Sequence, residues 1–181
     1  MGTRGIWGFK FNDEYKVTYN HFDSYLDGLG CNLKEELRNY DLDFMRKRFP
    51  LIIVVKDTDI PAKGIVEKLI EKKYIDKLSG MNGEDIYSAE WYSILRGWQG
   101  CIKPYMEYDM PYMCDGFEYA TDWIEFSYII DLDSGSFITY KNYFQNEGED
   151  IYLPVSIKLT ELNQLSDNAY VSIITNNWGK L

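Results

Sequence analysis

The sequence GIWGFKFNDEYKVTYNHF, residues 5–22, predicts a β-hairpin near the start of the chain. Apolar and polar residues alternate on both sides of Asn12-Asp13-Glu14, which is the pattern of two half-buried strands joined by a turn. A three-residue turn pairs Trp7 with Tyr19 and sets one apolar face against the core, whereas a two-residue turn places apolar residues opposite polar ones. We therefore expect the three-residue turn.

Beyond this hairpin, the apolar periodicity and the positions of glycine and proline outline the other elements. We expect helices over residues 32–48 (capped by Asn32 and Glu35), 59–74 and 167–178, helical pieces over 90–107, a buried strand at 51–55, a second hairpin over 124–143, a last strand at 155–159, and loops at 79–85 and 145–150. This order predicts a single α+β domain over residues 1–181. Its antiparallel sheet is built from the N- and C-terminal hairpins, with helices packed on it.

A cluster of polar residues lies just before the first strand and just after the second strand of this hairpin. The only histidine of the chain belongs to it, within the run YNHFDSYLDGLG at residues 19–30. The expected register places Arg4 opposite Phe22 and makes Arg4 a close neighbour of Asn20. If the chain is an enzyme, its candidate catalytic residues are Thr3, Arg4, Asn20, His21, Asp23 and Ser24.

Two catalytic readings of this cluster remain open. Thr3 near the amino terminus suits an N-terminal-nucleophile hydrolase, but that mechanism uses the nucleophile's own α-amino group and Gly2 precedes Thr3. Alternatively, His21 is a base that Asp23 orients, with Ser24 or Cys31 as nucleophile. The same side chains are equally suited to hydrogen-bonding the backbone of a tight loop.

Metal and cofactor sites are not expected. The run DLDSG at residues 131–135 is similar to the first half of a calcium loop, but Asn142 stands where the last ligand would be glutamate, so a turn between strands explains it. The cysteines Cys31, Cys101 and Cys114 are widely spaced and form no CxxC pair, which favours free thiols.

The charge of the chain bears on its partners. The formal net charge is −10, and eleven acidic residues but one lysine lie between Glu107 and Asp150. This excess argues against direct nucleic-acid binding and favours a protein partner with a basic surface. Exposed tyrosines and acids make the segment 105–118 a candidate binding patch, with the residues Tyr105, Glu107, Tyr108, Asp109, Tyr112, Asp115 and Glu118. Neither a membrane span nor a signal peptide is recognisable, so a soluble cytoplasmic protein is expected.

Four stretches together resemble an uncharacterised family found in bacteria, phages and fungi. They are TRG at residues 3–5, YNHFDSY with GLG within 19–30, EWYSILR at 90–96 and YIIDLDSG at 128–135. Leu26 departs from the pattern, because relatives generally carry proline there. The resemblance implies that residues 4–30 form a real site and, through its scatter among phages, a role in phage–host conflict. It implies no activity.

These observations favour a non-enzymatic interaction protein, of phage origin, that inhibits a host defence protein through its acidic 105–122 region. The alternative is a small hydrolase of the N-terminal-nucleophile type that uses the cluster around Arg4 and His21.

Overall fold

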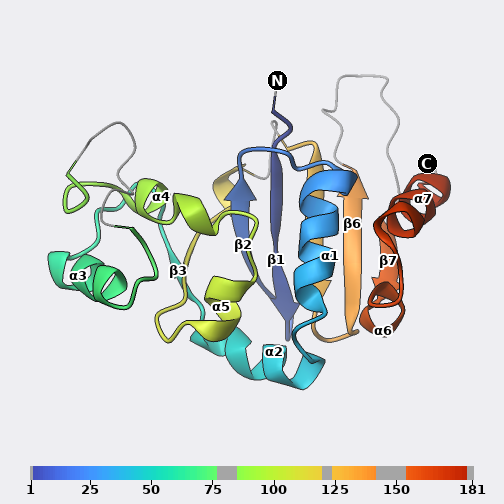
Figure 1. Cartoon of the computed structure of the whole chain (residues 1–181), viewed down its shortest axis with the longest axis horizontal. Helices are drawn as coiled ribbons and strands as arrows, with labels where there is room; N and C mark the ends of the chain where they lie inside the picture. Colours follow the sequence, from blue (N-terminus) through green and yellow to red (C-terminus); the bar gives the residue numbers. More distant parts are fainter. Residues whose placement is uncertain (1, 77–84, 120–123, 142–153, 179–181) are drawn as a thin grey trace.

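A five-stranded sheet forms the centre of the molecule, in the order β2-β1-β5-β6-β7 (Figure 1). The computed structural model describes residues 2–76, 85–119, 124–141 and 154–178, and the loop predicted at 145–150 and nearly all of that at 79–85 lie outside them. The strands are β1 (Gly5–Phe11), β2 (Glu14–Asn20), β5 (Phe126–Asp131), β6 (Ser136–Lys141) and β7 (Val155–Lys158). The two hairpins meet through a parallel pairing of β1 with β5, so the sheet is mostly rather than wholly antiparallel. The predicted α+β class is confirmed.

The predicted register of the first hairpin is wrong by one residue. The structure pairs Trp7 with Thr18 and Gly5 with Asn20, so the turn holds two residues rather than three. Asn12 and Asp13 both have positive φ, 51° and 61°, which is the geometry of a type I′ turn and matches the twist of the strands. Arg4 therefore lies just beyond the last pair of the ladder and not opposite Phe22.

This turn leads to a first prediction. Asp13 occupies the second central position of the turn, where glycine adopts a positive φ without steric cost. We expect Asp13→Gly to raise the midpoint of thermal unfolding by about 1–3 °C. An unchanged or lower midpoint in calorimetry would show that the side chain of Asp13 contributes more than its backbone conformation costs.

The register error arose because both faces of the β1–β2 pair are covered. Trp7 and Phe9 belong to the main core on one face, while Ile6 and Tyr19 pack with Ile124 on the other. Lys16 shares the face of Phe9, and its ammonium donates to the backbone oxygens of Phe49 and Ile52 at 3.1 and 2.9 Å. A polar residue is thus accommodated on the core side, which one-sided alternation does not anticipate.

The helix predicted over 32–48 is broken in two. A π-helical turn (Leu26–Gly30) leads directly into α1 (Cys31–Leu37), so Asn32 lies inside the helix and does not cap it. The second part is α2 (Leu42–Arg48), where the side chain of Asp41 accepts from Phe44 N at 2.8 Å. Asp41 begins a new helix because its carboxylate satisfies a free backbone donor of the first turn.

The middle of the chain forms short elements beside β2. They are β3 (Ile53–Val55), α3 (Lys63–Glu71), α4 (Trp91–Ile94), a 3₁₀ turn (Arg96–Trp98), α5 (Lys103–Glu107) and β4 (Tyr112–Cys114). The predicted helical pieces within 90–107 are confirmed. The strand predicted to be buried at 51–55 is instead an exposed one, since Ile53 and Val54 are 47% and 41% exposed. Among the described strands, β3 pairs with β4 alone.

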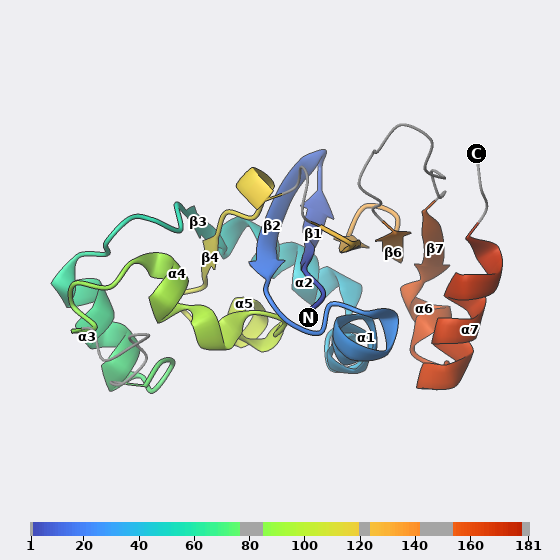
Figure 2. The ribbon, with the colours of Figure 1, turned by 90° about the horizontal axis from the view of Figure 1, so that it is seen from above.

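The main core lies between the sheet and the helices. Figure 2 shows α1 and α5 on the same side of β1 and β2. Trp7 and Tyr105 are buried there, with ring centroids 5.6 Å apart. The chain closes with α6 (Leu159–Leu162) and the predicted terminal helix α7 (Asp167–Asn177), which buries Tyr170 and Ile174. As a result, the loop after β2, the helix α1 and the segment 96–108 lie on one side of the sheet.

Candidate functional site

The loop after β2 is tightly closed. Asp23 has a φ of 50°, and its backbone oxygen accepts from Leu29 N at 2.8 Å. A Cβ at Gly28 would lie 2.2 Å from that oxygen, so glycine is required for this close approach. Gly28 therefore has a structural function in the motif.

Two proposed nucleophiles of this cluster are withdrawn from solvent. Thr3 is 1% exposed and Ser24 is fully buried. The Asn20 side-chain amide donates to Ser24 Oγ at 2.8 Å, and the Tyr128 hydroxyl donates to Ser24 O at the same distance. Neither Thr3 nor Ser24 lines either of the two pockets described below, so the geometry does not favour either as a nucleophile.

His21 is not paired with Asp23. Its Nδ1 lies 2.9 Å from the Tyr19 hydroxyl, and its backbone N–H donates to Gln99 Oε1 at 3.3 Å. Partial burial, together with the nearby charges of Arg96 and Arg4, lowers the pKa of His21 below its usual value. The lowered pKa favours the neutral imidazole. Because Nδ1 is bonded to the Tyr19 hydroxyl, Tyr19 and not Asp23 orients the ring.

Arg96 links this motif to the middle of the chain. Its guanidinium lies over the rings of Phe22 and Tyr92, at 5.2 and 5.1 Å from their centroids, and donates to Gln99 Oε1 at 2.9 Å. Stacking on aromatic rings is a favourable environment for a guanidinium. The motif loop and the 96–101 segment are thereby held together.

A pocket of about 520 Å³ opens between these two segments and α1, and we call it the motif pocket. Asn20 and Asp23 line it from the motif, Arg96 and Gln99 from the 3₁₀ segment. The face of α1 contributes residues at i, i+3 and i+4, namely Asn32, Glu35 and Glu36. Thr3, His21 and Ser24 are not among its lining residues.

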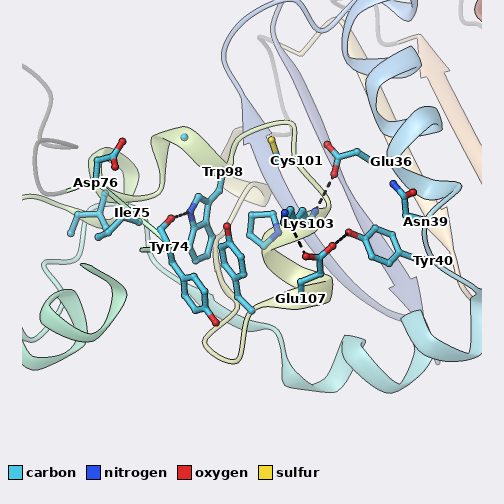
Figure 3. A pocket seen from close by; sticks show the side chains of 14 residues that line it. Glu36, Asn39, Tyr40, Tyr74, Ile75, Asp76, Trp98, Cys101, Lys103 and Glu107 are labelled. Carbon is cyan, nitrogen blue, oxygen red and sulfur yellow. Dashed lines mark hydrogen bonds and ion pairs between the residues drawn. The ribbon is translucent and has the colours of Figure 1, made fainter. Parts of the chain in front are cut away.

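A second pocket of about 490 Å³ lies next to it, and we call it the aromatic pocket (Figure 3). Its apolar part consists of Tyr74, Trp98 and Tyr108 with Ile75, Ile94 and Pro104, and its polar part includes Glu36, Asp76, Lys103 and Glu107. The pockets are adjacent because Glu36 and Cys101 line both. We refer to the two together as the pocket pair.

The pocket pair is predominantly acidic. Among the described residues, three carboxylates line the aromatic pocket and three line the motif pocket. Because Glu36 is shared, the pair has five described carboxylates: Asp23, Glu35, Glu36, Asp76 and Glu107. The described part of the chain contributes two lining cations, Arg96 and Lys103. Burial and the charge of Glu36 raise the pKa of Cys101, so this thiol is not a reactive thiolate at neutral pH.

The predicted binding patch is divided by the fold. Tyr105 is a core residue, 2% exposed, and cannot contact a partner on the surface. Glu107 and Tyr108 line the aromatic pocket, whereas Tyr112 packs against Trp91 and Asp115 accepts from Phe117 N. Asp109 is exposed and bonds to Lys72 and Tyr74, and the side chain of Glu118 lies outside the described part.

Several residues of the pocket pair were not anticipated from the sequence, above all Glu36, Arg96 and Trp98. The spacing of Asn32, Glu35 and Glu36 on one helix face was a usable signal. So was the arginine that ends EWYSILR. That these segments contact the motif loop depends on the tertiary fold and could not be predicted from a local pattern.

In the described part of the chain, no group of three or more histidine, cysteine, aspartate or glutamate residues is arranged to hold a metal ion. Nor does any described helix have the length and hydropathy needed to cross a bilayer.

Comparisons with protein-family models, with curated proteins and with solved structures find no match for this chain.

Proposed function

We propose that this chain is a non-enzymatic interaction protein whose pocket pair receives a basic segment of a protein partner. The observation that carries the proposal is the lining of the pocket pair, where the described residues include five carboxylates and two cations beside an aromatic wall. Such a surface attracts basic segments and repels nucleic acid. The net charge of −10 adds a long-range attraction for the same basic segment.

In its finer form, the proposal makes the chain a phage-derived inhibitor of a host defence protein. The resemblance to a family scattered among phages supports this form, and a cytoplasmic location goes with it. The hydrolase alternative has less support, because Thr3 and Ser24 are buried and His21 bonds to Tyr19 rather than to Asp23.

The proposal predicts that neutralising the pocket pair weakens partner capture. We expect the triple variant Asp23→Asn, Glu36→Gln, Glu107→Gln to bind its partner about tenfold more weakly than the wild type. Each amide keeps an oxygen acceptor, so the bonds that Glu36 accepts from Ile102 N and Lys103 N can persist. The measurement is affinity capture from a host-cell lysate, followed by titration of the captured protein at two salt concentrations.

A matched control removes the same charge elsewhere. Asp13→Asn, Asp59→Asn and Glu161→Gln change three exposed acids that do not line the pocket pair. This control should bind like the wild type. Equal loss in both triple variants would mean that overall charge, and not the pocket pair, drives the association.

A further inference from the structure

The aromatic pocket has a division of chemistry that suits one kind of side chain. Figure 3 shows the rings of Tyr74 and Trp98 at one end and the carboxylates of Glu36 and Glu107 at the other. A flat cation is accommodated by such a pocket, because its faces meet aromatic rings while its edge meets carboxylates. The volume of about 490 Å³ is within the range of pockets that take up a whole small ligand, so a long side chain fits.

The aromatic end is ordered before any ligand arrives. Tyr74 and Tyr108 stack with centroids 3.7 Å apart and planes 3° from parallel, and Trp98 meets Tyr108 edge-on at 5.4 Å. Trp98 Nε1 donates to Tyr74 O at 3.0 Å, which fixes the indole. Little side-chain entropy remains to be lost on binding.

The carboxylate end keeps acceptor capacity. Glu36 Oε2 accepts from Ile102 N and Lys103 N at 2.8 and 3.0 Å. Within the described residues, Glu36 Oε1 has no hydrogen-bond partner. Glu107 Oε1 accepts from the Tyr40 hydroxyl at 2.7 Å, and each carboxylate oxygen has a second lone pair. Two oriented carboxylates are therefore available to donors that enter the pocket.

From this arrangement we infer that the aromatic pocket is a receptor for a single arginine side chain of the partner. The inference rests on the proposed function and specifies the residue type that the basic segment inserts. A guanidinium offers five donors in one plane and stacks on tyrosine and tryptophan, whereas a lysine ammonium is a strongly hydrated point charge. Lys103 also lines the pocket, and its Nζ lies 3.6 Å from a Glu107 oxygen. A second cation that binds there must therefore form several directed hydrogen bonds, which arginine provides.

The test uses three capped tripeptides, glycine-X-glycine, where X is arginine, lysine or citrulline. Binding to the full chain is followed by heteronuclear NMR through the indole N–H of Trp98. We expect the arginine peptide to shift this resonance, the lysine peptide to bind at least about fivefold more weakly, and neutral citrulline not to bind detectably. Citrulline binding equal to arginine, or lysine binding equal to arginine, would overturn the inference. So would tighter binding of tetramethylammonium, since the pocket would then be a cage for a quaternary cation.

Matched variants locate the site. Glu36→Gln and Glu107→Gln should each weaken the arginine peptide about fivefold or more. Asp59→Asn and Glu161→Gln, exposed acids that line neither pocket, should leave it unchanged. Equal effects in both pairs would contradict the assignment.

The two proposals can fail separately. If partner capture depends on the pocket pair but the arginine peptide does not bind, the arginine inference falls and the proposed function stands. If the peptide binds but capture ignores the pocket-pair variants, the proposed function falls, because the pocket then serves a free guanidinium compound.

Discussion

Gly8→Ala is expected to destabilise the protein by at least about 3 kcal/mol, at the upper end of what overpacking costs. A Cβ at Gly8 would lie 2.1 Å from Lys16 O and 2.6 Å from Val17 Cα. Both atoms belong to the backbone of β2, so no side-chain rotation relieves the overlap. The β1–β2 pair would have to separate, which would also disturb the bonds of Lys16 to Phe49 and Ile52.

Gly64→Ala is the matched control. Gly64 lies in α3, and nothing lies within 4 Å of a Cβ built there. The same substitution should therefore stabilise the protein by about 0.5–1 kcal/mol through helix propensity. Denaturant unfolding of both variants, with soluble yield as a second readout, checks the pair. Similar midpoints for the two variants would show that β1 has room to move away from β2.

The structure also shows what the sequence could and could not predict about the fold. The second hairpin was predictable because Gly135, with a φ of 63°, supplies the conformation that its turn requires. The first hairpin was misjudged because Ile6 and Tyr19 are buried on one face while Trp7 and Phe9 are buried on the other. Alternation determines register only where one face of a sheet is solvated.

The candidate site was predictable at its edges but not at its centre. Asn20 and Asp23 were recognised as polar residues at a strand end, and both line the motif pocket. Glu107 was recognised from the local acidity of its segment. Glu36 joins the two pockets, yet it reaches Ile102 and Lys103 across 66 and 67 residues of chain. A contact at that separation follows from tertiary packing, and a local pattern contains no signal for it.

Lys34→Met should be the second large effect, with a loss of about 2 kcal/mol of unfolding free energy. Lys34 is fully buried, and its Nζ lies 2.9 Å from Asp167, 3.0 Å from Glu35 and 3.0 Å from Leu165 O. It thereby ties α1 to the start of α7. Breaking a buried ion pair costs about 3–5 kcal/mol when the remaining charge is buried. Both carboxylates here are at least half exposed and can be hydrated, so we expect less.

The control for Lys34 is Lys63→Met. Lys63 is 68% exposed and pairs with Glu67 at 3.8 Å one helical turn away, an arrangement that contributes about 0.5 kcal/mol or less. Urea unfolding of both variants at neutral pH gives the comparison. Equal losses would mean that Lys34 contributes no more than a surface ion pair.

The contribution of Lys34 should also have a defined pH range. Burial by itself lowers the pKa of Lys34, but hydrogen bonds to Asp167 and Glu35 outweigh it, and the pKa lies above its usual value. The bond from Lys34 is the main reason that the pKa of Asp167 is lowered. A lysine whose pKa is raised by folding contributes its full stabilisation below its unfolded-state pKa, and this stabilisation is lost as the pH rises through its folded-state pKa. An aspartate whose pKa is lowered by folding contributes its full stabilisation above its unfolded-state pKa, and this stabilisation is lost as the pH falls through its folded-state pKa. The stability difference between wild type and Lys34→Met should therefore be constant between about pH 5 and pH 10 and shrink on both sides. A difference that does not change with pH would show that Lys34 acts through packing of its aliphatic chain, with its charge contributing nothing.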